Sequence, residues 1–216
     1  MKVLEGIKVL ELGRVPPAEL PGMMLADMGA DVLKIDTPAA AGQSDAARSE
    51  AFSHTNRNKR SMTLNLKKPG ALEILMRLVK DADVVVENWR PDVKKKLGVD
   101  YEALAAVNPR IILASISGFG QDGPYAWRPG FDQIIQGMGG LMSVTGQPGT
   151  GPVRAGLAVA DMSAGLYAAI GILVALLERE AAERSAAQLE ALQAVKRDYG
   201  RLRQMETRYR VLFQMS

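Results

Sequence analysis

One carboxylate lies within a stretch of small and apolar residues. Asp161 belongs to Gly151–Gly165 (GPVRAGLAVADMSAG), just before the longest apolar run of the chain. A carboxylate before a helix is typical of an N-cap, where it accepts a hydrogen bond from a backbone N–H group. A carboxylate can also act as a nucleophile that forms a covalent intermediate. Both interpretations are compatible, since a helix N-terminus also stabilises the ionised form that attacks.

Two scarce residue types limit the chemistry that could accompany this carboxylate. The 216 residues contain no cysteine and a single histidine, His54. This composition excludes disulfides, thiolate metal sites and a cysteine nucleophile, and it argues against a histidine-rich metal centre or a Ser-His-Asp triad. The formal net charge of +3, from 27 basic and 24 acidic residues, does not favour nucleic acid as a partner. Carboxylates, amides and backbone groups remain for the chemistry.

The apolar segments favour a cytoplasmic protein that has no contact with a membrane. The N-terminal stretch MKVLEGIKVLELG lacks the apolar core and the small-residue cleavage site of a signal peptide. The longest apolar run, Ala164 to Leu177, is shorter than a membrane span and contains Gly165 and Gly171. We therefore expect a buried helix over this run.

The elements that must position Asp161 alternate between strands and helices. A β-rich run at 7–12, a helical pattern at 18–30 and a β-rich run at 31–36 form a βαβ unit. The alternation continues with strands at 61–66, 83–89 and 110–120 and helices at 69–82 and 101–107. This order predicts an α/β fold with a Rossmann-like, doubly wound, mostly parallel sheet that binds ligands at the carboxyl ends of its strands. No G-x-G-x-x-G pattern follows the first strand, so the sheet need not bind a dinucleotide.

The composition changes at about residue 179, where Ala, Glu, Gln and Arg become frequent. Apolar residues recur there at helical spacing on one face, namely Leu192, Val195, Tyr199, Leu202 and Tyr209. Because Gly200 and Glu206 interrupt this face, we expect a short amphipathic or coiled-coil helix. The sequence thus predicts an α/β part at 1–178 and a C-terminal amphipathic helical tail at 179–216.

Seven stretches follow one another in a recognisable order. They are LEGIKVLELG, LADMGADVLKID, NRNKRSMTLNLK, DADVVVENWRP, LGVDYEALAAVNPRIILASISGFGQDGP, FDQIIQGMGGLMSVTG and GPVRAGLAVADMSAG. Together they resemble the family III CoA-transferases, which include formyl-CoA and carnitine CoA-transferases and the related α-methylacyl-CoA racemases. Separately, the ending METRYRVLFQMS resembles the helical lead-in of PAS sensor domains, with an amphipathic surface helix as the alternative.

The resemblance to the CoA-transferases implies a covalent role for Asp161. In the family, the matching aspartate attacks the thioester of an acyl-CoA to give a mixed anhydride, and an aspartyl-CoA thioester then passes CoA to the incoming acid. The partners implied are an acyl-CoA and a carboxylic acid. CoA enters as a thioester substrate, so no permanently bound cofactor or metal is implied. Full-length relatives form homodimers.

The resemblance also implies a set of CoA-binding residues. The residues that match the family's contacts are Val15, Pro16, Pro17, Leu64, Asn65, Leu66, Lys67, Asn88, Trp89, Arg90 and Lys96. Lysine and arginine suit the phosphates of CoA. On residue type alone, Lys67 and Lys96 would instead be solvated surface charges. The match departs at Thr37, where some members of the family have an arginine.

Asp132 matches a recurrent acidic position near the active site of the transferases. It could tune the pKa of Asp161 or orient the substrate, or it could cap the helical segment QIIQGMGG that follows it. The racemase branch has a catalytic histidine in this region. Here the residues are Pro129 to Asp132, so a transferase is favoured over a racemase.

The resemblance ends near residue 180, whereas full-length members of the family continue with a further domain. We therefore expect a truncated transferase whose activity depends on how much of the pocket the missing part supplies. The alternative is a noncatalytic CoA-binding fragment, or one that associates through its helical tail. Acyl specificity depends on pocket shape, so the acids exchanged do not follow from these residues.

Overall fold

Five parallel strands form one sheet in the computed structural model, which describes residues 2–38 and 54–214. They are β1 (Lys8–Glu11), β2 (Asp31–Asp36), β3 (Arg60–Thr63), β4 (Val84–Glu87) and β5 (Ile112–Ser115). Their order across the sheet is β3-β2-β1-β4-β5. The chain winds outward from β1 to β3 and then crosses back to β4. The winding direction therefore reverses between β1 and β4, which is where such sheets bind ligands.

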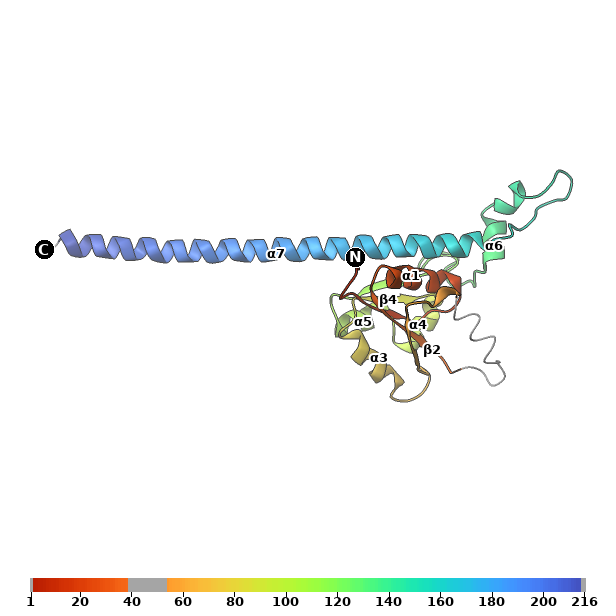
Figure 1. Cartoon of the computed structure of the whole chain (residues 1–216), viewed down its shortest axis with the longest axis horizontal. Coiled ribbons are helices and arrows are strands. Elements are labelled where there is room, and N and C mark those ends of the chain that lie inside the picture. The colour runs from red at the N-terminus through yellow and green to blue at the C-terminus, as the bar shows by residue number, and fades with distance from the viewer. Residues whose placement is uncertain (1, 39–53, 215–216) are drawn as a thin grey trace. The chain divides into compact units, whose positions relative to one another are not determined.

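Helices cover both faces of this sheet, as Figure 1 shows. The helices next to the strands are α1 (Pro16–Asp27), α3 (Ala71–Val79), α4 (Pro91–Leu97) and α5 (Tyr101–Val107). Side chains alternate along a strand, so Leu10 and Val85 pack in one buried cluster with Leu75 of α3 and Leu104 of α5. Val9 and Glu11, which are also buried, point from β1 to the opposite face. One face of β1 thus places a carboxylate inside the protein.

Local sequence signals explain where the short helices begin and end. Proline occupies the start of α1 and of α4, where its missing N–H group costs nothing. The side chain of Asp100 caps α5 by accepting a hydrogen bond from Ala103 N at 3.0 Å.

The predicted doubly wound α/β fold is confirmed, and β2 has the bounds predicted for it. The helix α6 (Asp132–Met138) covers most of the helical segment QIIQGMGG. Two short elements were not predicted, namely α4 and the 3-10 helix η1 (Leu141–Val144). Each spans two turns or fewer, which is too short for a helical period to be recognised. In α4 the sequence PDVKKKL also has few apolar residues.

The chain divides into two compact units, 1–173 and 174–216. A single helix, α7 (Val159–Gln214), contributes to both, whereas the sequence predicted a separate tail helix from 179. Within the first unit, Ala169 and Ile172 of α7 are buried, while Leu166, Tyr167 and Ile170 are exposed. The expectation of a buried helix was therefore right for one face only, since the described residues leave the apolar side chains of the other face exposed.

The second unit is helical throughout its described residues, and side chains are described up to Arg201. Its charged residues pair locally, as in Arg184 with Glu180 and Arg201 with Asp198. The segment that resembles the PAS lead-in lies beyond the described side chains, so that likeness stays a prediction.

By length and composition alone, α7 is also apolar enough between Val159 and Arg201 to cross a membrane. Helices that pack inside soluble proteins have the same composition, so this property does not distinguish the two cases. The expected absence of membrane contact stays a prediction.

Candidate active site

A pocket of about 120 Å³ lies at the reversal point, beyond the carboxyl ends of β1 and β4. Its walls are formed by Pro17, Asn88, Ile116, Ser117, Gly118, Gly130, Ile135, Ala160, Asp161 and Ala164. The fold thus brings together three residues that the sequence predicted for the site, namely Pro17, Asn88 and Asp161. They come from segments following β1 and β4 and from the first turn of α7.

Two glycines let distant segments of the pocket wall touch. A Cβ atom on Gly118 would lie 2.4 Å from the Cα atom of Gly130, and the reverse distance is the same. Only glycine at both positions permits this crossing of the two backbones. The crossing holds the loop after β5 against the segment that leads into α6.

Asp132 caps the helix that carries Asp161. Its Oδ1 atom accepts hydrogen bonds from the backbone N–H groups of Ala160, at 2.9 Å, and Asp161, at 3.4 Å. Asp161 itself lies in the first turn of α7. The capping carboxylate of α7 therefore belongs to Asp132, which leaves the Asp161 side chain facing the pocket.

The alternative role of Asp132 as the cap of its own helix does not hold. Phe131 occupies the N-cap position of α6, and no side-chain capping bond forms there. Asp132 is buried, and its Oδ2 atom accepts a hydrogen bond from Gln136 Nε2 at 2.6 Å and lies 3.6 Å from Arg154 Nε. Gln136 in turn accepts a bond from Ala155 N at 2.9 Å. These contacts fix the Asp132 carboxylate beside the start of α7.

The pKa of Asp161 is raised above its ordinary value. Partial burial is the largest cause, and repulsion by the nearby Asp132 carboxylate adds to it, whereas Arg154 acts in the opposite direction. Two carboxylates whose environments differ in this way are typical of a catalytic site. The arrangement gives Asp161 a destabilised negative charge at a pocket wall.

The loop Arg14–Pro17 enters the site without the backbone donors of a dinucleotide fold. Pro16 and Pro17 have no N–H group, and the carbonyl of Val15 already accepts the N–H groups of Ala18 and Glu19, both at 3.2 Å. The N-terminus of α1 is therefore unlike the phosphate-binding turn of a Rossmann fold. This agrees with the absence of the glycine-rich pattern in the sequence.

The other predicted binding residues lie in two surroundings. Leu64 is buried in the core, and Leu66 and Trp89 pack against it, so their side chains serve the core. Asn65 accepts a hydrogen bond from Lys67 N at 3.1 Å in the turn after β3. None of these five residues lines the pocket at Asp161.

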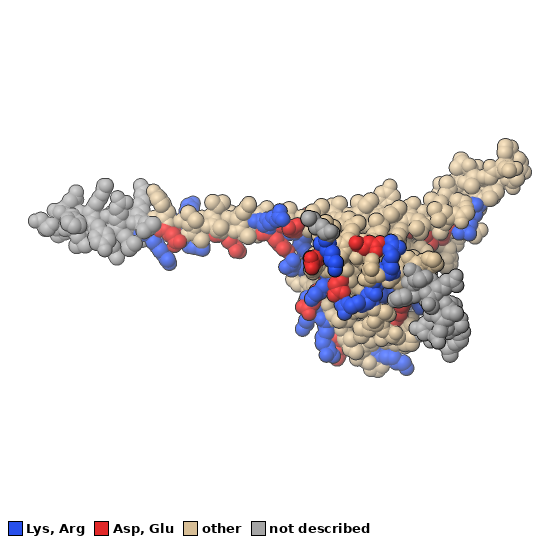
Figure 2. All heavy atoms as spheres, viewed as in Figure 1, with Lys and Arg blue, Asp and Glu red and all other residues tan. Residues whose placement is uncertain are grey.

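The predicted cations are exposed or paired with a surface carboxylate. Arg90 and Lys96 both approach Asp92 Oδ2, at 3.4 and 3.5 Å, and Lys67 is exposed. Figure 2 shows basic and acidic side chains interspersed over the face of the α/β unit in view. That face therefore has no large region of one charge that would attract anions in general.

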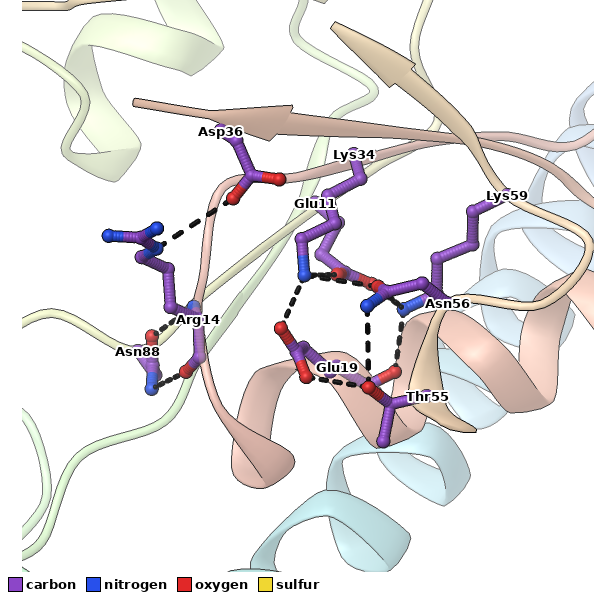
Figure 3. Close-up of polar contacts among 9 residues, drawn as sticks. All are labelled: Glu11, Arg14, Glu19, Lys34, Asp36, Thr55, Asn56, Lys59 and Asn88. Carbon is purple, nitrogen blue, oxygen red and sulfur yellow. Dashed lines mark hydrogen bonds and ion pairs between the residues drawn. The ribbon is translucent and has the colours of Figure 1, made fainter. Parts of the chain in front are cut away.

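A buried group of charges lies near the pocket, under α1. We call it the Glu11 cluster, and Figure 3 shows its members Glu11, Glu19, Lys34, Thr55, Asn56 and Lys59. Lys59 Nζ donates to Glu11 Oε2 at 2.7 Å, and Lys34 pairs with Glu19 and lies 3.6 Å from Glu11 Oε1. Asn56 accepts from Lys34 at 3.0 Å, and Thr55 donates to Glu19 at 2.7 Å.

Burial decides the direction of the pKa shift for Glu11 and Lys59 in the Glu11 cluster. It raises the pKa of Glu11 to about 7 despite the attraction of Lys59 and Lys34, and it lowers the pKa of Lys59. For Glu19 burial acts in the same sense as for Glu11, but hydrogen bonds from Lys34 and Thr55 outweigh it and lower the pKa. The cluster ties β1, β2, α1 and the segment at 55–59 together.

Sequence reasoning missed several residues of the site. Arg154 stands in the stretch quoted for Asp161 but was not singled out, and Gln136 follows Asp132 by one helical turn. That spacing is a signal that could have linked Gln136 to Asp132. Ser117 and Ile116 carry no local signal, because only the end of β5 brings them to the pocket.

Comparison with known proteins agrees with the fold and the motifs. The family described as CoA-transferase family III matches residues 4–193. The chain is 46% identical over 187 residues to the succinate–glutarate CoA-transferase of Agrobacterium fabrum, covering 81% of this chain and 47% of that protein. It is 41% identical over 186 residues to the acetyl-CoA:oxalate CoA-transferase of Acetobacter aceti, covering 82% and 47%.

Solved structures give the same result. The crystal structure of a CAIB/BAIF family protein from Brucella suis matches with a TM-score of 0.76 and 42% identity, covering 83% of this chain and 50% of that one. The chain thus spans about half the length of the relatives it matches. The family match, the ordered motifs and the shared fold agree, and the chain belongs to CoA-transferase family III.

Proposed function

We propose that this chain carries the nucleophile of a CoA-transferase that moves CoA between an acyl-CoA and a carboxylic acid. The observation that carries the proposal is the position of Asp161, which lines the pocket at the reversal point of the sheet with its pKa raised. Ligands of doubly wound sheets bind at this point. Family membership supports the same reaction class.

The reaction uses the Asp161 carboxylate twice. A carboxylate oxygen of Asp161 bonds to the thioester carbonyl carbon, the carbon–sulfur bond breaks, and CoA leaves as a thiolate. The thiolate attacks the aspartyl carbon of the anhydride, which forms the aspartyl-CoA thioester and releases the donor acid as a carboxylate. The acceptor carboxylate then repeats both steps in reverse order, so that acyl-CoA forms and Asp161 is regenerated.

The surroundings of Asp161 favour the first step. Partial burial and the negative charge of Asp132 destabilise the ionised Asp161 side chain. Attack on the thioester removes that charge from the Asp161 side chain, because the electron pair leaves with the CoA sulfur, and so relieves both effects. The cost of partial burial is thus recovered in the reaction.

The acids and the remaining binding residues are also proposals. The relatives named above act on succinate, glutarate and oxalate, so we propose a short dicarboxylic acid as acceptor. Lys67, Arg90 and Lys96 would supply cations for the CoA phosphates. As for full-length relatives, we propose a homodimer in the cytoplasm.

Mass spectrometry of trapped Asp161 tests the proposal. The chain is incubated with succinyl-CoA and hydroxylamine, which converts an aspartyl anhydride or thioester into a hydroxamate on Asp161. Asp161→Asn is the matched control, because it keeps the shape but cannot form the ester-like intermediate. Unmodified Asp161, under conditions in which a full-length relative becomes modified, would contradict the proposal.

A second candidate function is association through the helical tail. Leu189, Leu192, Val195 and Tyr199 recur every three or four residues on α7 and are 58%, 67%, 67% and 66% exposed. A second copy of the same helix offers an identical stripe, and pairing two such stripes buries both. The candidate occupant is therefore another copy of this chain.

Light scattering distinguishes this candidate from a monomeric tail. The intact chain is expected to be a dimer, and deletion of 179–216 or the variant Leu192→Gln/Val195→Gln is expected to give a monomer. Glu190→Gln changes a residue off the stripe and serves as the control. An unchanged molar mass after the deletion argues against the tail as an assembly element.

A further inference from the structure

Val15 has a backbone conformation that a β-branched residue rarely adopts. Its φ is 64° and its ψ is 167°, a region that is populated almost only by glycine. Asn58 is the other non-glycine residue of positive φ among the described residues, and asparagine tolerates that conformation far better. Val15 is 56% exposed, so packing of its side chain does not explain the strain. Something else must hold this turn.

The side-chain amide of Asn88 holds the residue before Val15. Asn88 Nδ2 donates to the carbonyl of Arg14 at 2.6 Å, and Arg14 N donates to Asn88 Oδ1 at 3.1 Å. Figure 3 shows this pair of bonds between the segment after β1 and the segment after β4. Gly13 makes the approach possible, since a Cβ atom there would lie 2.9 Å from Asn88 Oδ1.

The residues after Val15 are held equally firmly. The Val15 carbonyl accepts hydrogen bonds from the N–H groups of Ala18 and Glu19 in the first turn of α1. Pro16 restricts Val15 to an extended ψ. Arg14 is thus held on one side of Val15 and α1 on the other, and Val15 connects them with a positive φ.

The residues on either side of Asn88 are anchored by their own hydrogen bonds. Trp89 N donates to Glu87 Oε2 at 2.7 Å, and Lys94 Nζ donates to Glu87 Oε1 at 3.2 Å and to Ser115 Oγ at 2.7 Å. Glu87 and Lys94 are buried, so these bonds are shielded from water. A line of contacts thus runs from β5 to the strained turn.

We propose that Asn88 is a positioning residue that locks the Arg14–Val15 turn in its strained form and thereby presents Pro17 and the start of α1 to the pocket at Asp161. A turn that is already ordered loses little entropy when CoA binds. The CoA part of this inference rests on the proposed function. The locking of the turn does not, because it concerns the free protein.

A thermal unfolding cycle tests the locking without any ligand. Val15→Gly removes the strain, whereas Val15→Ala keeps a Cβ atom and therefore keeps it. In the native background the glycine variant is expected to melt about 2–6 °C above the alanine variant. In an Asn88→Ala background the turn can relax, so the difference should fall below about 1 °C. An equal difference in both backgrounds would overturn the proposal.

Two further measurements complete the test. If Asn88→Ala does not fold, Asn88→Asp replaces it in the same cycle, since it keeps the acceptor for Arg14 N but loses the donor to the carbonyl. Calorimetric titration with free CoA is expected to show affinity at least about tenfold weaker in the folded Asn88 variant, with the surface variant Glu190→Gln as the unchanged control. Equal affinity would contradict a positioning role. A native chain that does not bind CoA contradicts the proposed function instead, and the melting cycle then decides the role of Asn88.

Discussion

Two groups of carboxylates lie close to the carboxyl edge of the sheet, and they differ in how many cations surround them. In the Glu11 cluster, Lys34 and Lys59 lie against Glu11 and Glu19, and the side chain of Lys59 is 0% exposed. At the pocket, Asp161 lies near a second carboxylate, Asp132, and among the described residues the half-exposed Arg154 is the cation that acts on it. We call the Glu11 cluster the closed group, because cations match its carboxylates and it is buried. We call Asp161 and Asp132 the open group, because two carboxylates share one nearby cation and Asp161 lines a pocket.

The charges around a buried carboxylate distinguish a structural role from a catalytic role better than its pKa does. Burial raises the pKa of both Glu11 and Asp161. Only Asp161 lines a pocket, and only Asp161 has a carboxylate as its main charged neighbour. A buried carboxylate that is paired with cations contributes to the folded structure, whereas two carboxylates close together at a cavity are typical of a catalytic site.

The largest expected effect comes from breaking the closed group. Lys59→Met removes the hydrogen-bonded cation of buried Glu11 and leaves only Lys34, at 3.6 Å. Breaking a buried ion pair costs about 3–5 kcal/mol of unfolding free energy. Urea denaturation measures this loss. Lys68→Met, on an exposed lysine, is the control and is expected to change stability by less than about 0.5 kcal/mol. Equal stability of the two variants would mean that the cluster is not a stability element.

The pH dependence of unfolding gives the next largest effect. The pKa of Glu11 is about 7 in the folded state against an ordinary value of 4.5. Between these two pH values the folded state therefore holds a proton that the unfolded state has lost. The stability that this proton contributes is full below pH 4.5 and is lost as pH rises through 7. The loss is on the order of 3 kcal/mol.

Glu11→Gln isolates this contribution, because the amide stays neutral at every pH. The difference in unfolding free energy between the native chain and this variant should change between pH 4.5 and about 7, the ordinary and the folded pKa of Glu11. A constant difference across this range would show that Glu11 does not titrate there.

Asp132→Asn tests the open group with a smaller effect on stability. An asparagine keeps the Oδ1 acceptor for the amides of Ala160 and Asp161 but loses the Oδ2 acceptor of Gln136 Nε2, so the loss should be about 1–2 kcal/mol. Removal of the like charge should lower the pKa of Asp161. Carbodiimide modifies protonated carboxyl groups, so the midpoint of Asp161 labelling, read by mass spectrometry, should move to lower pH. An unchanged midpoint would remove Asp132 as a cause of the shift.

Sequence alone predicts the frame of this protein well. The alternation of β-rich runs and helical patterns predicts the doubly wound sheet, and for β2 the predicted and observed bounds agree. The small and apolar residues around Asp161 single out this carboxylate, and the resemblance to the family suggests that it is a nucleophile. These features are local, or they depend on the order of motifs along the chain.

The contacts within both carboxylate groups could not be predicted. Lys59 and Glu11 are 48 positions apart, and Ala160 and Asp132 are 28 positions apart. Nothing in the local sequence says which of several lysines meets Glu11, or that Asp132 caps a helix other than its own. Such pairings arise only when strands and helices pack, so they require the tertiary structure.

Arg154→Gln has the smallest expected effect on stability and sharpens the comparison most. The Arg154 side chain is 46% exposed and lies 3.6 Å from Asp132, so its loss should cost less than about 1 kcal/mol. Because Arg154 lowers the pKa of Asp161, the variant should raise it, and the labelling midpoint should move to higher pH, opposite to the effect of Asp132→Asn. A shift in the same direction for both variants would mean that a structural change, rather than charge, controls Asp161. Opposite shifts with only small losses of stability would distinguish this open group from the Glu11 cluster, where charge and stability change together.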